Sequence, residues 1–368
     1  MKIRTATITF HSPHNYGSML QAYALQNTLL NLGYSNEIIN LRTERQILLY
    51  NRWKSKPVRN LRTLLKRTYM LPYQNAIDKK YQLYEDFLKN ELNTTQEFKT
   101  LEEIEKANLS YDCYISGGDQ IWNTAPDDFD WSFYLPFVKT GKRISYAVSM
   151  GPHAETQVTD RDKVKRLLQQ YNHISVREEG TANLVQSLVD IPVSIELDPA
   201  LLFTGEEWGK HVSTDPLIKG DYILLYSPGY KKSVYDLAKY LSKKLKMKVV
   251  ITLFTLEDRK YNFVRHYSTG PWEFLNLTKN AKLVLSGSFH ALVFATLFHT
   301  PFYAVDGDKD NRMKTFLSNM NLADRTISLS DCEQKLATAL STDFNQADQY
   351  LKIKREESIT YLKNAVEN

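Results

Sequence analysis

The chain has 368 residues, 42% of them hydrophobic, and its 47 basic and 42 acidic residues give a net charge of +5. This length and composition predict about two domains with sizeable cores, and so mild a charge gives no indication of nucleic-acid binding. No stretch reaches the roughly 18–20 apolar residues of a membrane-spanning helix, and the N-terminus lacks the apolar run of a secretory signal. Two distant cysteines suggest neither a disulfide framework nor a zinc site, so we expect a cytoplasmic protein.

The first forty residues have the pattern of a strand–helix–strand unit. Residues 2–10 alternate as a strand, and a polar turn follows at 11–18. The segment 18–32 has apolar residues on one helical face and ends at Gly33, a residue that favours a helix C-terminus. Residues 36–41 return as a strand. Such a unit predicts a parallel sheet.

A basic segment interrupts this pattern. Residues 42–108 have mostly helical periodicity, which predicts a helical insertion. From Arg45 to Ala76 the chain contains no acidic residue, and its basic residues there are Arg45, Arg52, Lys54, Lys56, Arg59, Arg62, Lys66 and Arg67. Aromatic residues and leucines alternate with them, so the segment 45–77 suits an anionic membrane face or a lipid diphosphate. A solvated helical face that packs on the domain is the alternative.

The remaining chain alternates strands and helices in two series. Strands are predicted at 112–116, 143–149, 173–177, 192–197, 222–227, 247–252, 282–285 and 301–304. Helices are predicted at 158–171, 179–189, 231–246, from 271 onward, and at 289–299, 311–319, 331–341 and 346–365. This alternation is typical of an α/β protein with doubly wound parallel sheets.

We therefore expect two Rossmann-like domains that face each other across a cleft. The first covers residues 1–205 and contains the basic helical insertion, and the second covers 206–345. The last helix, 346–368, is expected to be able to pack back on the first domain.

Ligands of open parallel sheets bind beyond the carboxyl ends of the strands, and polar clusters occupy such places here. They are His14–Ser18 after the first strand, Gly117–Gln120 after a middle strand, and Ser286–His290 in the second half. Arg177 ends a further short strand.

The turn Ser286, Gly287, Ser288 leads through Phe289 to His290. Small residues let the backbone approach a ligand, and the free N–H groups of the following helix form an anion site. His290, in the first turn, is placed to bind a phosphate or deliver a proton. Alternatively, Ser288 only caps the helix and His290 packs in the core.

The other candidate residues have alternatives of the same kind. Arg177 suits a two-pronged contact with a carboxylate or phosphate, or it pairs with a neighbouring acid such as Glu178. The turn of His14, Asn15, Tyr16 and Gly17 suits ligand binding, or it is an ordinary connection of turn-forming residues.

Asp119 and Gln120 suit sugar hydroxyls, although Asp119 is equally suited to capping a turn. The chain lacks the glycine patterns of dinucleotide-binding and P-loop proteins, a nucleophile elbow and a metal-binding constellation. We therefore expect neither a metal nor a cofactor.

Taken together, six segments resemble successive motifs of the polysaccharide pyruvyl transferase family, in the family's order. They are HNYGSMLQAYALQ (14–26), YISGGDQIWN (114–123), RISYAVSMG (143–151), ISVREEG (174–180), ELDPALLF (196–203) and GPWEFLNLTKNAKLVLSGSFHALVF (270–294). The resemblance extends from about residue 3 to residue 305 and is interrupted by the basic insertion.

The resemblance implies phosphoenolpyruvate as donor, a sugar in a glycan or lipid-linked repeat as acceptor, and a cyclic pyruvate ketal as product. It also implies two facing Rossmann-like domains, similar to the glycosyltransferase B-type architecture, with Arg177 and His290 placed at the donor. One position departs from the family pattern, because Ser288 stands where an arginine is common. Backbone N–H groups of 288–290 or lysines would have to replace that phosphate ligand.

These features give a mechanistic hypothesis and two rivals. Arg177 would hold an anion, His290 would act as acid or phosphate ligand, and Ser286, Ser288 and the helix N-terminus would complete the donor pocket. Asp119 and His14 are candidates for acceptor contact or general base. A nucleotide-sugar-dependent glycosyltransferase and a non-catalytic glycan-binding or assembly protein remain as alternatives, since a fold alone does not decide chemistry. A cytoplasmic enzyme of this kind could contact the inner membrane face peripherally.

Overall fold

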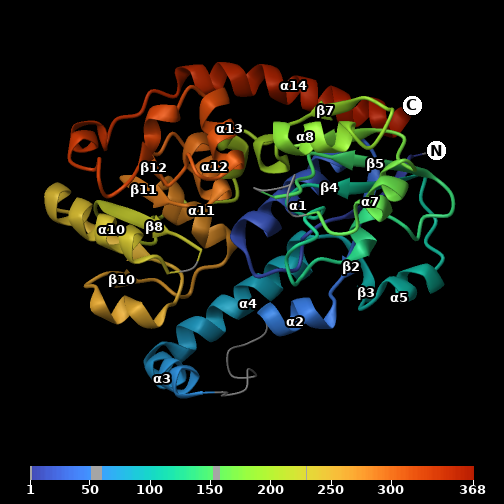
Figure 1. The fold of residues 1–368 in the computed structure, drawn as a ribbon. Helices are drawn as coiled ribbons and strands as arrows, with labels where there is room; N and C mark the ends of the chain where they lie inside the picture. Colours follow the sequence, from blue (N-terminus) through green and yellow to red (C-terminus); the bar gives the residue numbers. More distant parts are fainter. Residues whose placement is uncertain (1, 51–59, 152–157, 229) are drawn as a thin grey trace. The chain divides into compact units, whose positions relative to one another are not determined.

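A computed structural model of the chain describes residues 2–50, 60–151, 158–228 and 230–368 (Figure 1). Their contacts divide them into two compact units. The N-terminal unit comprises residues 2–50, 87–203 and 351–368, and the C-terminal unit comprises 60–86 and 204–350.

The N-terminal unit is built on a parallel sheet in the order β3-β2-β1-β4-β5. Its strands are β1 (Arg4–Ile8), β2 (Ser35–Leu41), β3 (Thr94–Phe98), β4 (Cys113–Gly117) and β5 (Lys142–Tyr146). A further parallel pair, β6 (Ile174–Val176) and β7 (Val193–Ile195), is joined to the β5 segment by single bridges. The strands β1 and β4 are almost entirely buried, as expected for a parallel sheet that is covered on both faces.

Helices cover this sheet and connect its strands. They are α1 (Tyr16–Asn31), α2 (Glu44–Tyr50), α5 (Leu101–Lys106), α7 (Arg161–Leu168) and α8 (Glu179–Gln186), with short 3-10 turns η3 (Trp131–Tyr134) and η4 (Pro199–Leu201). Nearly the whole of α1 is buried. Asn15 starts it by accepting the N–H groups of Gly17 and Ser18 with its side chain.

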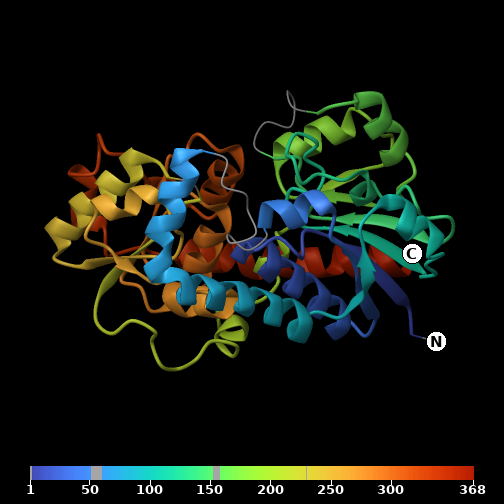
Figure 2. The same cartoon turned by 90° about the horizontal axis from the view of Figure 1, so that it is seen from below.

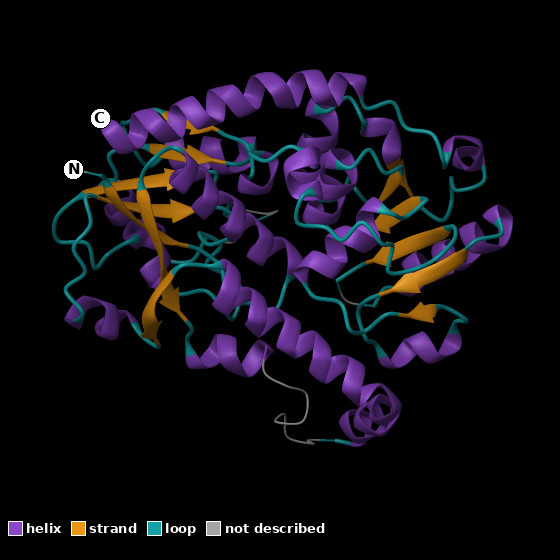
Figure 3. Ribbon diagram, turned by 180° about the vertical axis from the view of Figure 1, so that it is seen from behind, coloured by secondary structure: helices purple, strands orange, loops and turns teal. Residues whose placement is uncertain are grey.

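The C-terminal unit contains a second parallel sheet, in the order β10-β9-β8-β11-β12-β13. Its strands are β8 (Tyr222–Tyr226), β9 (Lys248–Ile251), β10 (Val264–Arg265), β11 (Leu283–Ser286), β12 (Phe302–Val305) and β13 (Thr326–Ile327). In Figure 3, helices flank both groups of strands.

The helices of this unit are α3 (Leu61–Met70), α9 (Gly205–Gly209), α10 (Lys232–Leu245), α11 (Pro271–Lys279), α12 (Phe289–Leu297) and α13 (Asn311–Asn319), with 3-10 turns η2 (Leu71–Tyr73), η5 (Leu256–Lys260), η6 (Ala323–Arg325) and η7 (Gln334–Thr338). Two longer helices, α4 (Gln74–Glu91) and α14 (Asn345–Glu367), have residues in both units. Figure 2 shows α3 and α4 as consecutive helices, in blue to cyan.

Residues 351–368 of α14 belong to the N-terminal unit. Ser358 accepts the N–H of Leu197 at 3.0 Å and donates to a carboxylate oxygen of Glu196 at 2.7 Å. Tyr361 donates to the carbonyl oxygen of Ser145 at 3.1 Å. These bonds fix the end of the chain on the sheet of that unit.

The structure differs from the sequence-based elements in several places, and β10, β13 and α9 are short elements that were not predicted. The predicted helix 331–341 is instead a set of turns with the 3-10 turn η7. The hydroxyl of Tyr303 donates to the carbonyl oxygen of Lys335, which an α-helix would use for the N–H of Ala339. That N–H bonds to the carbonyl oxygen of Leu336 instead. The predicted helical insertion 42–108 contains strand β3, which pairs with the buried β2. Its alternation is weak because Gln96 and Glu97 are both exposed.

Candidate functional site

The switch point of the N-terminal sheet lies between β1 and β4. From β1 the chain builds the sheet outward through β2 and β3, whereas β4 and β5 extend it on the other side. Connections therefore diverge at the carboxyl ends of β1 and β4, which is where open α/β sheets bind ligands. The predicted clusters 14–18 and 117–120 follow these two strands.

A buried hydrogen bond joins the two clusters. The hydroxyl of Ser18 donates to a carboxylate oxygen of Asp119 at 2.6 Å. Asp119 has a positive φ of 51° and follows Gly118 with φ 69°. A Cβ at Gly118 would lie 1.9 Å from the side-chain oxygen of Gln21, so glycine is required there. The turn thus holds the Asp119 carboxylate at the end of β4.

The predicted acceptor residues divide by exposure. His14, Asn15 and Gln120 are partly exposed, whereas Asp119 is 7% exposed and Tyr16 is completely buried. The burial of Tyr16, like that of Gly17, favours a packing role over a direct glycan contact. Asn15 uses its side-chain oxygen to cap α1, which is the ordinary connection that the sequence left open as an alternative.

Arg177 follows β6 and forms a buried ion-pair network. Its Nη1 donates to Asp198 at 2.6 Å and its Nε to Glu178 at 3.2 Å. Burial by itself lowers the pKa of Arg177, but the negative charges of Glu178, Asp198 and Asp119 outweigh it and hold the pKa above its ordinary value. The pairing with Glu178 that the sequence left open as an alternative is present, and anion binding by Arg177 stays a prediction.

The partners of Arg177 are themselves fixed. Glu178 accepts the hydroxyl of Thr181 at 2.7 Å, and Asp198 accepts the N–H of Ala200 at 2.9 Å. One guanidinium therefore stands among three carboxylates, those of Asp119, Glu178 and Asp198. The network therefore contains more negative than positive charge, and each of its side chains belongs to a residue that is at most 7% exposed.

The switch point of the C-terminal sheet lies between β8 and β11. Ser286, the last residue of β11, donates its hydroxyl to the carbonyl oxygen of Tyr226, the last residue of β8. The same hydroxyl accepts the N–H of Ser288 at 3.0 Å. Because Ser286 is completely buried and uses its hydroxyl in this way, it shapes the turn.

The turn remains accessible beyond Ser286. Gly287 is exposed and Ser288 is partly exposed. Ser288 occupies the N-cap position of α12, but its side chain makes no capping hydrogen bond to the described residues. The first N–H groups of a helix have no partner within the helix, so α12 presents donors and a partial positive charge at this turn.

His290 lies in the first turn of α12 and is 8% exposed. The ring of its neighbour Phe289 packs against Phe316, with ring centroids 5.5 Å apart. This leaves the backbone N–H of Phe289 as its group for binding a donor substrate.

Sequence reasoning missed Ser227, which follows β8. An added Cβ at Gly287 would lie 3.9 Å from the Ser227 hydroxyl, so the turns after β8 and β11 are adjacent. A serine at the end of the predicted strand 222–227 was the available signal.

Arg177 belongs to the N-terminal unit and His290 to the C-terminal unit. That both residues bind one donor molecule stays a prediction. Among the described residues, no group of three or more His, Cys, Asp or Glu side chains is arranged to hold a metal ion. Within the same ranges, none of the helices combines the length and apolarity needed to cross a bilayer.

Two Rossmann-like units with parallel sheets define an α/β protein of the two-domain glycosyltransferase B type, as the sequence predicted. Solved structures with this fold align along the whole chain. A UDP-N-acetylglucosamine 2-epimerase from Rickettsia bellii aligns with a TM-score of 0.58 at 8% identity, covering 100% of this chain and 98% of its own. The UDP-GlcNAc 2-epimerase from Methanocaldococcus jannaschii aligns with a TM-score of 0.58 at 13% identity, covering 99% and 100%.

The family model of the polysaccharide pyruvyl transferases matches residues 15–309, most of the chain. The chain belongs to this family, which confirms the resemblance seen in the motifs and supports a transferase. No curated protein sequence matches the chain significantly.

Proposed function

We propose that this protein transfers pyruvate from phosphoenolpyruvate to two hydroxyls of a sugar in a glycan or lipid-linked repeat, forming a cyclic ketal. The observation that carries the proposal is the family match over residues 15–309, which includes the polar turns at both switch points. The accessible turn at Gly287 and Ser288, followed by His290, provides a place for the donor.

The donor brings a carboxylate and a phosphate. The N–H groups at the start of α12 and the Ser288 hydroxyl are the groups suited to bind the phosphate, in the absence of the arginine common at position 288. In this proposal His290 protonates the methylene carbon, which makes the neighbouring carbon electrophilic, or it binds the phosphate.

The ketal forms by two additions at that carbon. One sugar hydroxyl forms a C–O bond with it, phosphate leaves with the electrons of its own C–O bond, and the second hydroxyl closes the ring. Of the two hydroxyl protons released, one balances the proton taken up by the methylene carbon and the other leaves with phosphate. Asp119 is the candidate acceptor for a hydroxyl proton. Gln120, which is partly exposed, follows it in the sequence, and the partly exposed His14 belongs to the turn of Ser18, which donates to Asp119. Arg177 is proposed to balance the carboxylates around it.

The acceptor is proposed to reside at an anionic membrane face, which the protein contacts peripherally. Leu61, Leu64 and Leu65 of α3 are 70%, 48% and 47% exposed, and Lys66 and Arg67 follow them in the chain. Exposed leucines beside basic residues are typical of interfacial helices. The rest of the basic segment, residues 51–59, lies outside the described residues.

The function is tested by incubating the protein with phosphoenolpyruvate and candidate glycans. We expect release of phosphate together with a pyruvate-sized mass gain on one glycan. Inhibition by a nucleoside diphosphate with no response to phosphoenolpyruvate would instead favour a nucleotide-sugar glycosyltransferase. Saturable glycan binding without phosphate release would favour a non-catalytic glycan-binding protein.

A further inference from the structure

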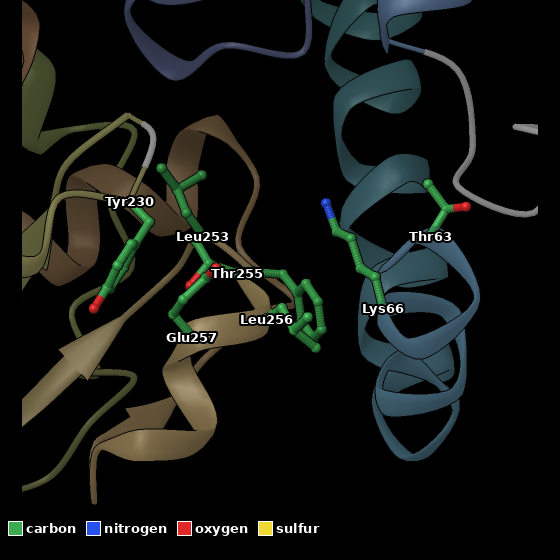
Figure 4. A pocket seen from close by; sticks show the side chains of 8 residues that line it. Thr63, Lys66, Tyr230, Leu253, Thr255, Leu256 and Glu257 are labelled. Atoms are coloured by element: carbon green, nitrogen blue, oxygen red, sulfur yellow. The ribbon is translucent and has the colours of Figure 1, made fainter. Parts of the chain in front are cut away.

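A cavity of about 490 Å³ lies in the C-terminal unit, and its lining residues do not belong to the turns at the two switch points (Figure 4). Its lining residues come from helix α3 and from the segments that follow β8 and β9: Thr63, Lys66, Tyr230, Leu253, Phe254, Thr255, Leu256 and Glu257. Because β8, β9 and β11 are parallel, the cavity lies at the same edge of the sheet as the turn before α12. Its volume falls in the range of about 300–1,000 Å³ typical of small-molecule sites.

Buried contacts fix the wall formed by residues 253–257. The carboxylate of Asp258, which is completely buried, accepts the N–H of Thr255 at 2.8 Å and the hydroxyl of Tyr267 at 2.9 Å. Phe254 packs against Tyr267, with ring centroids 5.3 Å apart. The loop after β9 is therefore held in one conformation before any ligand binds, which lowers the entropic cost of binding.

Two further contacts attach the insertion helices α3 and α4 to the loop after β9. Tyr69 of α3 packs against Phe254 at a centroid distance of 5.4 Å. Lys80 of α4 donates to the carbonyl oxygen of Thr252 at 3.0 Å. Figure 4 shows Lys66 extending from α3 toward the loop that carries Thr255. The basic insertion thus contributes a wall of the cavity.

The lining has the composition of a site for a neutral polyol. It combines one cation, Lys66, with one carboxylate, Glu257, so its formal charges balance. The hydroxyls of Thr63 and Thr255 donate to the Asn60 carbonyl oxygen and to the Asp258 carboxylate, so toward a ligand they can act only as acceptors. Leucines and the rings of Tyr230 and Phe254 provide apolar surface. A phosphate would favour an excess of cations, whereas a pyranose offers both hydroxyls and an apolar face.

We propose that this cavity is a sugar-binding subsite that holds one neutral residue of the acceptor glycan. This inference rests on the proposed function, since it assigns the subsite to the acceptor of that reaction. One side of α3 then contributes to the glycan site, through Thr63 and Lys66, while Leu61, Leu64 and Leu65 of the same helix remain exposed.

Binding is tested without donor or turnover, by saturation-transfer NMR and titration with neutral methyl glycosides of glucose, galactose, mannose and N-acetylglucosamine. We expect at least one glycoside to bind. Glu257→Gln and Lys66→Ala should each weaken it by about tenfold or more, the loss expected from one hydrogen bond to a charged group. Glu333→Gln, whose side chain is 82% exposed, and the exposed Lys239→Ala are the matched controls and should bind normally.

Three outcomes would overturn the subsite. The wild-type protein binds none of the glycosides, both cavity variants bind a glycoside as tightly as the wild type does, or uridine monophosphate displaces the bound glycoside. Thermal unfolding of each variant checks that the fold is retained, and Lys66, exposed on α3, is not part of the core. Glycoside binding that depends on Glu257, without any pyruvyl transfer, would leave the subsite standing and reject the proposed reaction. Pyruvyl transfer with unaltered acceptor affinity in both variants would support the proposed reaction and reject the subsite.

Discussion

The guanidinium Nη1 of Arg177 lies 2.6 Å from a carboxylate oxygen of Asp198, and the two side chains are 4% and 0% exposed. The pair joins the end of β6 to the turn η4, which lies 21 residues further along the chain. Since Glu178 also contacts Arg177, removal of the guanidinium would leave two carboxylates without their shared counter-charge.

We expect Arg177→Met to reduce the free energy of unfolding by about 3–5 kcal/mol, the usual cost of breaking a buried ion pair from one side. Asp198→Asn should cost less, because the guanidinium keeps Glu178. The double variant should be more stable than the sum of the two losses predicts. Urea unfolding followed by circular dichroism measures all three, with the exposed Arg166→Met as control. Wild-type stability of Arg177→Met would show that the pair does not stabilise the fold.

We expect His290→Ala to lower turnover with phosphoenolpyruvate by at least about a hundredfold, the contribution of a positioned acid. His290→Gln separates two roles, because glutamine keeps a hydrogen bond and loses the transferable proton. A phosphate ligand predicts a raised KM with kcat largely kept, whereas an acid predicts a lowered kcat. His211→Ala, at an exposed position of the same unit, is the control. Turnover near the wild-type value in His290→Ala would remove His290 from the mechanism.

His11 makes stability depend on pH. It is 1% exposed, its Nε2 lies 3.0 Å from the side-chain oxygen of Asn40, and burial lowers its pKa below the ordinary 6.5. As the pH falls below about 6.5, the unfolded chain takes up a proton that the folded protein resists, so stability decreases. His11→Gln should flatten this decrease between that pH and the folded pKa. Urea midpoints across pH 5–7.5 provide the measurement, and an unchanged slope would argue against the assignment.

The exposed leucines of α3 predict binding to anionic vesicles. Changing Leu61, Leu64 and Leu65 together to Gln should weaken partitioning by at least about tenfold, because each leucine contributes apolar area to the interface. The matched control changes Leu217, Leu329 and Leu340, which are 41%, 47% and 38% exposed in the same unit. Vesicle pelleting at low and high salt measures the effect. An equal loss in both triple variants, or no pelleting of the wild type at low salt, would contradict membrane contact through α3.

Local patterns in the sequence predicted much of the fold. The start of α1 could be located to within two residues, with a helix predicted from 18 and observed from Tyr16. The reason is local, because the capping bonds from Asn15 reach only two and three residues along the chain. The strand β3 was missed because an edge strand with exposed polar residues carries little period-two signal.

By itself, then, the sequence determined two strand–helix series with a polar turn after each central strand, together with the family to which the chain belongs. Tertiary structure alone decided which side chains those turns use for packing and which remain accessible. Asp198 pairs with Arg177 across 21 residues, Ser286 binds the carbonyl oxygen of Tyr226 across 60, and Lys66 lines a cavity with Glu257. Such contacts depend on strand register and helix packing, which bring together residues that no local periodicity relates.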